Sequence, residues 1–215
     1  AQYLTADNLK LLLSMPDRST KKGRRDMVML TVLYDTAARV SELIDIRICD
    51  VRLDVPAVIT LHGKGRKIRS VPLIKHTVDL LKVYYEENRI DSVLHSDLPL
   101  FWNTHRKKLT RSGVTYILRK YVEMAQGVSS DMPLNVSPHK LRHTKAMHLV
   151  QANVNPVYIK DFLGHADIST TEIYARADNE AKRSALEKAT EHLRLPPVTN
   201  WEQDSELIDW LSSLG

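Results

Sequence analysis

The chain has 215 residues, which is enough for one sizeable hydrophobic core or two small ones. Its composition, 43% hydrophobic and 27% charged, excludes global disorder, and its apolar runs fall short of the ~18 residues that span a bilayer. The single cysteine, Cys49, excludes an internal disulfide framework, while the net charge of +5 favours an anionic partner.

The first part of the chain is predicted to be helical. Thr5 can cap a helix over 7–15, in which leucines recur at helical spacing. The strongly apolar stretch 26–34 predicts a buried helix, and a shorter helix is expected to start at 41–44. These segments would supply much of the core.

The period of the sequence then changes from that of helices to that of strands. Residues 57–61 and 67–73 are rich in β-branched side chains and flank a short segment that contains Gly63 and Gly65. Two glycines between two strand-like runs predict a hairpin whose turn tolerates positive φ.

Helical periodicity returns in the rest of the chain, so we expect a mainly α fold with a small antiparallel β-sheet (α+β). Proline or a capping residue stands at several of the expected helix starts, and Gly164 is an expected helix end. Further helices are predicted over 75–87, from Thr110 or Ser112 to 125, from Pro138 to about 152, from Asn155 to Gly164, over 169–175 and 179–193, and over 207–214.

Charge is unevenly distributed along the chain. Residues 201–215 carry −4, and because the whole chain carries +5, residues 1–200 carry +9. The basic residues form four clusters, which either fold to one face and bind a polyanion or remain solvated loops and helix surfaces. The candidate nucleic-acid contacts in these clusters are Lys21, Lys22, Arg24, Arg25, Arg66, Lys67, Arg106, Lys107, Lys108 and Lys140.

One predicted helix carries residues suited to bind an oxyanion. His139, Arg142 and His143 stand at positions i, i+3 and i+4, so they share a helix face, and arginine offers phosphate a planar fork of donors. The alternatives are an ordinary polar face or a metal site completed by His165. Positive charge at Lys140 and Arg142, and the lack of the glutamate of H-E-x-x-H, argue against metal.

Arg39 and Tyr174 are candidate functional residues only if they lie close to such an oxyanion site. Arg39 follows an apolar segment, and a buried arginine needs an anionic partner, which Glu42, one turn later, can supply. Tyr174 follows His165 by nine residues. A tyrosine hydroxyl, with an ordinary pKa of about 10, becomes a competent nucleophile where positive charge stabilises the charge that develops. Considered alone, Tyr174 is typical of a half-buried residue in a helix, and Lys64 is typical of an ordinary lysine in a turn.

These stretches together resemble the catalytic domain of the tyrosine recombinases, or phage integrase family, most closely Xer-like and transposon integrases. The resemblance covers roughly residues 3–190. One departure is Ala37-Ala38-Arg39, where the family usually has a triplet of glycine, a hydrophobic residue and arginine. The matching segments, in the same order and at similar intervals, are 38–43, 63–67 with 71–73, 137–143, and 163–165 with 169–174.

The resemblance implies how a scissile phosphate would be bound. Arg39 and Arg142 would hold its non-bridging oxygens. His139 and His165 would donate hydrogen bonds to it, and His139 could also accept a proton from the nucleophile. His143 matches the motif without an implied chemical step.

The resemblance also implies the chemistry and the function. Tyr174 would attack phosphorus to form a 3′-phosphotyrosyl link, Lys64 would protonate the 5′-oxygen leaving group, and Glu42 would orient the cluster. The expected activity is site-specific DNA recombination or integration without metal, ATP or another cofactor. The alternatives are DNA relaxation of the type IB topoisomerase kind and a DNA-binding regulator that kept the fold.

Domain organisation and partners follow from the same resemblance. We expect a catalytic domain over 1–195, then a linker and a C-terminal helix over 196–215 that docks either in cis or in trans. The N-terminal core-binding domain usual in the family is expected to lie outside this chain. The expected partners are double-stranded DNA with specific recombination sites and further copies of the protein, as a tetramer on DNA. The expected location is the cytoplasm, associated with the nucleoid.

Overall fold

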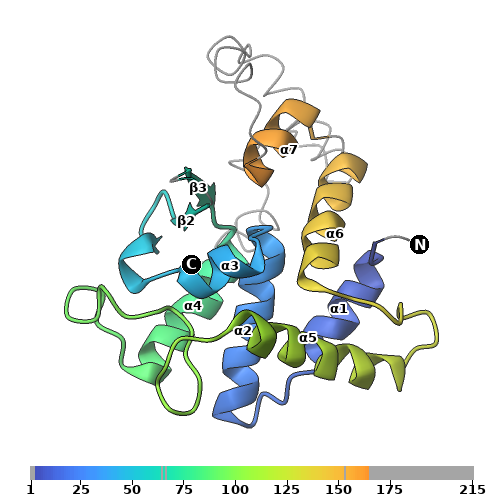
Figure 1. Ribbon diagram of the computed structural model, residues 1–215, viewed down its shortest axis with the longest axis horizontal. Coiled ribbons are helices and arrows are strands. Elements are labelled where there is room, and N and C mark those ends of the chain that lie inside the picture. Colours follow the sequence, from blue (N-terminus) through green and yellow to red (C-terminus); the bar gives the residue numbers. More distant parts are fainter. Residues whose placement is uncertain (1–2, 64, 66, 153, 165–215) are drawn as a thin grey trace, which may run out of the picture. The chain divides into compact units, whose positions relative to one another are not determined.

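The computed structural model describes residues 3–63, 65, 67–152 and 154–164, all of which lie within the unit Ala1–Thr170 (Figure 1). Helices dominate this part of the chain and accompany one small antiparallel sheet, which confirms the predicted fold class. The helices and the domain boundary predicted beyond residue 164 lie outside the described residues. The elements are α1 (Ala6–Ser14), α2 (Lys21–Asp35), α3 (Val40–Asp45), the 3₁₀ turn η1 (Ile48–Asp50), β1 (Val51–Arg52), β2 (Val58–His62), β3 (Ile68–Pro72), α4 (Lys75–Asn88), α5 (Arg111–Gln126), α6 (Pro138–Gln151) and α7 (Pro156–Leu163).

The predicted helix starts are confirmed to within a residue or two where a side-chain oxygen satisfies a free backbone N–H of the first turn. The hydroxyl of Thr5 accepts a hydrogen bond of 3.2 Å from the backbone N–H three residues later, and Thr110 does the same at 3.0 Å. Ser137 caps α6, and Pro138 occupies a first-turn position at which no N–H is needed. Gly164 ends α7 with a φ of 63°.

Helix α2 begins earlier than predicted. The apolar stretch 26–34 is preceded by a basic first turn that starts at Lys21, and Thr20 caps it by accepting from the backbone N–H of Gly23 at 3.0 Å. This basic turn lacks the apolar repeat on which the prediction depended. The rest of α2 is deeply buried and contacts α1, α4 and α6, so it is the central helix of the core. None of the described helices is long and apolar enough to cross a membrane.

The predicted hairpin is confirmed, and a third strand joins it. Strands β2 and β3 pair with Leu61 opposite Arg69, and Gly65 in their turn has a φ of 74°. Strand β1 pairs with the other edge of β2, giving the order β1-β2-β3. At two residues, β1 is too short to produce a sequence pattern. The turn between Gly63 and Lys67 is closed by a 2.7 Å backbone hydrogen bond and encloses Lys64, which lies outside the described residues.

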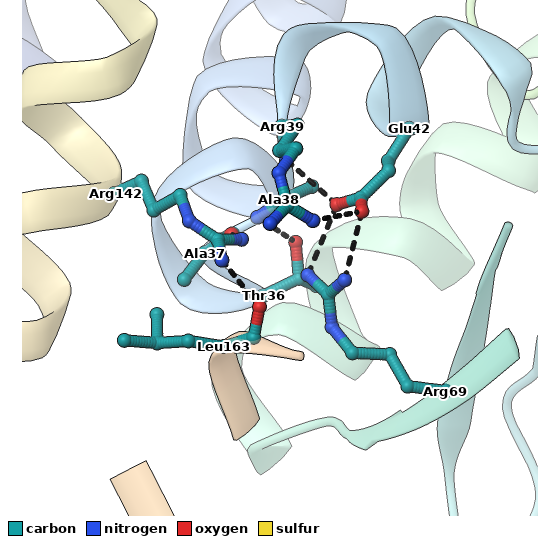
Figure 2. A network of polar contacts seen from close by, with 8 residues as sticks. All are labelled: Thr36, Ala37, Ala38, Arg39, Glu42, Arg69, Arg142 and Leu163. Atoms are coloured by element: carbon teal, nitrogen blue, oxygen red, sulfur yellow. Dashed lines mark hydrogen bonds and ion pairs between the residues drawn. The ribbon is translucent and has the colours of Figure 1, made fainter. Parts of the chain in front are cut away.

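A tight corner connects α2 to α3 and positions the candidate site. Ala37 in this corner has a φ of 47°, in the left-handed region that favours glycine, and it is fully buried. This residue stands where the family triplet has its glycine, so the backbone adopts a glycine-like conformation without the glycine. The carbonyl oxygen of Ala37 is thereby turned toward α6, where Arg142 donates to it at 2.5 Å (Figure 2).

Two matched substitutions test whether this corner is strained. Ala37 and Ala38 are both fully buried, but only Ala37 has positive φ, so Ala37→Gly relieves backbone strain while Ala38→Gly does not. We expect Ala38→Gly to lower the free energy of unfolding by at least about 1 kcal/mol more than Ala37→Gly. Urea unfolding of both variants measures the difference. Equal losses, or a larger loss at Ala37, would contradict the strain.

Candidate active site

Arg39 and Glu42 form the ion pair that the sequence predicts. Arg39 precedes α3, and its backbone N–H donates to Oε2 of Glu42 at 2.8 Å while its Nη1 donates to Oε1 at 2.8 Å (Figure 2). The Glu42 side chain is 1% exposed, whereas that of Arg39 is 45% exposed. The buried carboxylate therefore anchors a guanidinium that remains accessible to a ligand.

A second arginine, Arg69, approaches the same carboxylate from strand β3. Its Nη1 donates to Oε1 of Glu42 at 2.9 Å, and its Nη2 donates to Oε2 at 3.0 Å (Figure 2). In the sequence, Arg69 ends the basic cluster of residues 62–69, and no motif predicted it as a site residue. One signal was available: Arg69 shares a strand face with the buried Val71, so it occupies a position where an apolar residue is usual.

The four hydrogen bonds decide the ionisation of Glu42. Burial alone would raise the pKa of this carboxyl, but hydrogen bonds from Arg69 and Arg39, together with the charge of Arg69, outweigh burial and lower it. Glu42 is therefore ionised at neutral pH.

Arg142 on α6 is the third guanidinium of the cluster, and it is 6% exposed. Nη1 donates to the Ala37 carbonyl and Nη2 to the Leu163 carbonyl, so this one side chain joins α6 to the corner after α2 and to the end of α7. Burial, and then repulsion from Arg39 and Arg69, lower the pKa of Arg142 to about 10, against the attraction of Glu42. Arg142 is still protonated at neutral pH, and the site carries an excess of positive charge.

The other predicted residues of α6 differ in exposure. His139 and Arg142 lie one turn apart, but His139 is exposed while Arg142 is buried, and His143 is half-buried with its ring 6.4 Å from that of Tyr3. The structure thus brings together Arg39, Glu42 and Arg142, and leaves His139 accessible on the first turn of α6. The predicted roles of these residues stay predictions.

Three of the six predicted catalytic residues lie outside the described residues, namely Lys64, His165 and Tyr174, as does Arg66. The metal alternative depends on His165 and is untested for the same reason. The flanking residues are described: Gly63 begins the hairpin turn, and Gly164 ends α7 directly before His165.

A cavity of about 890 Å³ lies beside the three-arginine cluster. Its walls come from α3, the hairpin, the start of α5 and the end of α7. Cations and carboxylates both line it, but the Glu42 carboxylate is already occupied by two guanidinium groups, which favours an anionic ligand. The charged lining residues are Arg39, Lys67, Arg69, Arg111, Glu42, Asp45 and Asp161.

The predicted nucleic-acid contacts divide into exposed and engaged side chains. Arg24 pairs with Glu87 of α4, and Arg25 pairs with Asp26 and donates to the Trp102 carbonyl at 2.9 Å, so both hold α2 to its neighbours. Lys108 pairs with Asp45, and Lys140 is half-buried. Five predicted contacts are exposed and form no ion pair with another described residue, namely Lys21, Lys22, Lys67, Arg106 and Lys107.

The ion pairs of Glu42 predict how stability depends on pH. Because folding lowers the pKa of Glu42, its contribution is complete above the unfolded value of about 4.3 and is lost as pH falls through the folded value. Glu42→Gln leaves the arginines uncompensated, so we expect it to lower the free energy of unfolding at pH 7 by about 3 kcal/mol.

Denaturant unfolding of Glu42→Gln and the wild type at pH 7 and at successively lower pH measures this effect. The difference between the two proteins should shrink once the pH is low enough to protonate Glu42. The control is Glu123→Gln, which removes an exposed carboxylate 3.7 Å from Arg119 and should change stability by less than about 0.5 kcal/mol. A difference for Glu42→Gln that is independent of pH would contradict the buried ion pairs.

Comparison with known proteins identifies relatives of this chain. The family model described as "Phage integrase family" matches residues 2–181. The chain is 38% identical over 175 residues to the tyrosine recombinase XerD of Listeria innocua, an alignment that covers 80% of this chain and 57% of XerD. The chain spans less than two thirds of the length of the curated relatives it matches.

Solved structures agree with the sequence relatives. The fold is similar to that of XerA recombinase, with a TM-score of 0.64 and 28% identity, over 90% of this chain and 65% of XerA. It is also similar to XerH site-specific recombinase bound to palindromic difH substrate in a post-cleavage complex, with a TM-score of 0.64 and 25% identity, over 86% of this chain and 52% of XerH. This chain belongs to the phage integrase family and has the fold of a tyrosine recombinase catalytic domain.

Proposed function

We propose that this chain breaks and rejoins DNA strands as the catalytic part of a site-specific recombinase or integrase. The observation that carries the proposal is the convergence of Arg39 and Arg142 beside a cavity in a member of the phage integrase family. Phosphoryl transfer depends mainly on positioning and on stabilising negative charge at phosphorus, and two guanidinium groups supply both.

The arginines retain donors for a phosphate after their internal hydrogen bonds are counted. A guanidinium has five N–H donors, and Arg142 uses two of them for the carbonyls of Ala37 and Leu163. Arg39 uses one for Glu42. Both side chains can therefore be fixed by the protein and still bind the non-bridging oxygens of a phosphodiester. Because Arg39 is the more exposed of the two, it is suited to contact the incoming phosphate first.

The proposed reaction has two balanced steps. Tyr174 loses its proton to His139 and attacks phosphorus, which forms a 3′-phosphotyrosyl bond and breaks the bond to the 5′-oxygen. Lys64 protonates that oxygen, and His165 donates a hydrogen bond to the phosphate. In the second step the 5′-hydroxyl of another strand gives its proton to Lys64 and attacks phosphorus, which breaks the bond to Tyr174, and His139 returns the proton to the tyrosine oxygen. The phosphotyrosyl bond conserves the energy of the broken linkage, so the chemistry needs no ATP, and the arginines and histidines would stabilise the negative charge on the phosphate in place of a metal.

The proposed partners are double-stranded DNA with recombination sites and further copies of this protein, as a tetramer on DNA. The DNA partner is supported by the XerH complex, because XerH has a similar fold and is bound to its difH substrate. The exposed cations Lys21, Lys22 and Lys67, with others of the basic clusters, would contact the phosphate backbone. We further propose a catalytic domain over 1–195 and a C-terminal segment over 196–215. The acidic part of that segment, residues 201–215, would dock on its own catalytic domain (in cis) or on that of another copy (in trans). The protein would act on nucleoid DNA in the cytoplasm.

Covalent capture tests the proposed function and identifies the target sequence in the same experiment. The chain is incubated with a library of nicked duplexes made from the genome of its source organism, the mixture is denatured, and DNA that remains attached is sequenced. We expect attached DNA that shares a sequence, with the attachment at Tyr174 located by peptide mass.

The matched control for this capture is Tyr174→Phe, which removes only the nucleophilic oxygen. It should abolish the covalent product while DNA affinity changes by less than about threefold, because the arginines are untouched. Attachment that persists in Tyr174→Phe, or the absence of any attached DNA with the wild type, would contradict the proposal.

A further inference from the structure

Arg69 is the charged residue of the cluster that the sequence motifs leave without a role. Its side chain is 14% exposed, and both Nη atoms donate to the Glu42 carboxylate. Its buried Nε has no hydrogen-bond partner among the described residues. Glu42 thus orients the guanidinium through both Nη atoms.

The Arg69–Glu42 pair lies in close contact with two glycines. A Cβ placed on Gly164 would lie 3.0 Å from both Cδ and Nη1 of Arg69, and a Cβ placed on Gly63 would lie 3.3 Å from Oε1 of Glu42. A Cβ at either position would require the neighbouring side chain to shift by a few tenths of an ångström, so its absence permits this close approach. Gly63 directly precedes Lys64, and Gly164 directly precedes His165. The pair therefore lies against the segments that lead into two proposed catalytic residues.

Charge balance shows what Arg69 does for Arg39. Without Arg69, the buried Glu42 carboxylate would be compensated by Arg39 alone and would draw that guanidinium fully into the ion pair. With Arg69 filling one side of the carboxylate, Arg39 needs only one of its Nη donors for Glu42 and stays 45% exposed. Arg69 donates one N–H of each Nη to Glu42, and the second N–H of each Nη remains, so direct contact with a phosphate is tested separately below.

We propose that Arg69 is a positioning residue of the active site, which holds Glu42 so that Arg39 faces the phosphate and which sets the approach of the segments at Gly63 and Gly164. It acts through other residues and does not touch the reacting atoms. The inference rests on the proposed DNA cleavage for its kinetic test, but its structural part stands independently of that function.

The kinetic test compares Arg69→Met and Arg69→Lys with the wild type on the duplex recovered by covalent capture. At saturating DNA, Arg69→Met should slow formation of the covalent product by about 100-fold while DNA affinity changes by less than about threefold, since misplaced groups affect the transition state most. Arg69→Lys keeps the charge without the two-point pair and should recover part of the rate. The control Arg52→Met, an exposed arginine on β1 of the same sheet, should match the wild type.

A double-mutant cycle separates positioning from direct contact. If Arg69 acts through Glu42, then Arg69→Met in a Glu42→Gln background should slow the reaction by less than about threefold further. Independent losses that multiply would mean that Arg69 contacts the phosphate itself, and would overturn the proposal. A wild-type rate in Arg69→Met would also overturn it.

A readout without DNA keeps the proposal testable if the proposed cleavage fails. NMR of arginine side chains reports rotation and solvent exchange of the Arg39 guanidinium, which the Glu42 pair should restrict differently in the wild type and in Arg69→Met. We expect altered Arg39 signals in Arg69→Met and intermediate ones in Arg69→Lys, the variant to use if the first does not fold. Arg39 signals identical to the wild type would overturn the positioning role, whatever the DNA assays give.

Discussion

The buried carboxylate of Glu42 is the interaction on which the candidate site depends. It accepts four hydrogen bonds, two from Arg39 and two from Arg69, and so joins the start of α3 to strand β3. A carboxylate this buried would be unfavourable without such partners. Its charge, in turn, allows arginines to be gathered where they would otherwise repel one another. Glu42 is therefore both a structural centre and the counter-charge of the site.

The cluster still carries more positive than negative charge, and this excess favours the binding of an anion such as a phosphate. Arg39 and Arg69 bind the one carboxylate and Arg142 lies near them, and the pKa of Arg142 is lowered by burial and by repulsion from these two arginines. The protein holds the charges in place through carbonyl and carboxylate contacts before any ligand arrives. Such preorganisation is what stabilises charge developing on a phosphate during its transfer. An anion that enters the cavity would relieve the repulsion.

Much of the local structure could be predicted because its causes are local. Thr5, Thr110 and Ser137 cap helices through their own hydroxyls, and Gly164 ends a helix through its own backbone freedom. The pairing of Arg39 with Glu42 was predictable for the same reason, since one turn of chain separates them. The sequence pattern also indicated the hairpin, in whose turn Gly65 adopts the positive φ that glycine permits.

The features that sequence reasoning missed depend on contacts between distant segments. In the sequence, nothing distinguishes Arg69 from the neighbouring basic residues. Only the folded sheet places it against Glu42, 27 residues away in the chain. The burial of Arg142 depends on the carbonyl of Ala37, 105 residues distant, and no pattern within α6 reveals it. Strand β1 exists because β2 offers it an edge. The catalytic motifs thus identified the segments, but the tertiary fold decides which of their cations are buried, paired or accessible.

The most direct test of phosphate binding by the arginine cluster is a crystal structure of the chain with its captured duplex and vanadate, which mimics the phosphorus of the transition state. We predict that vanadate oxygens lie about 2.7–3.2 Å from donors of both Arg39 and Arg142, with Glu42 still bound to Arg39 and Arg69. Vanadate bound away from these arginines, or Arg39 released from Glu42 when the anion binds, would contradict the role of the cluster.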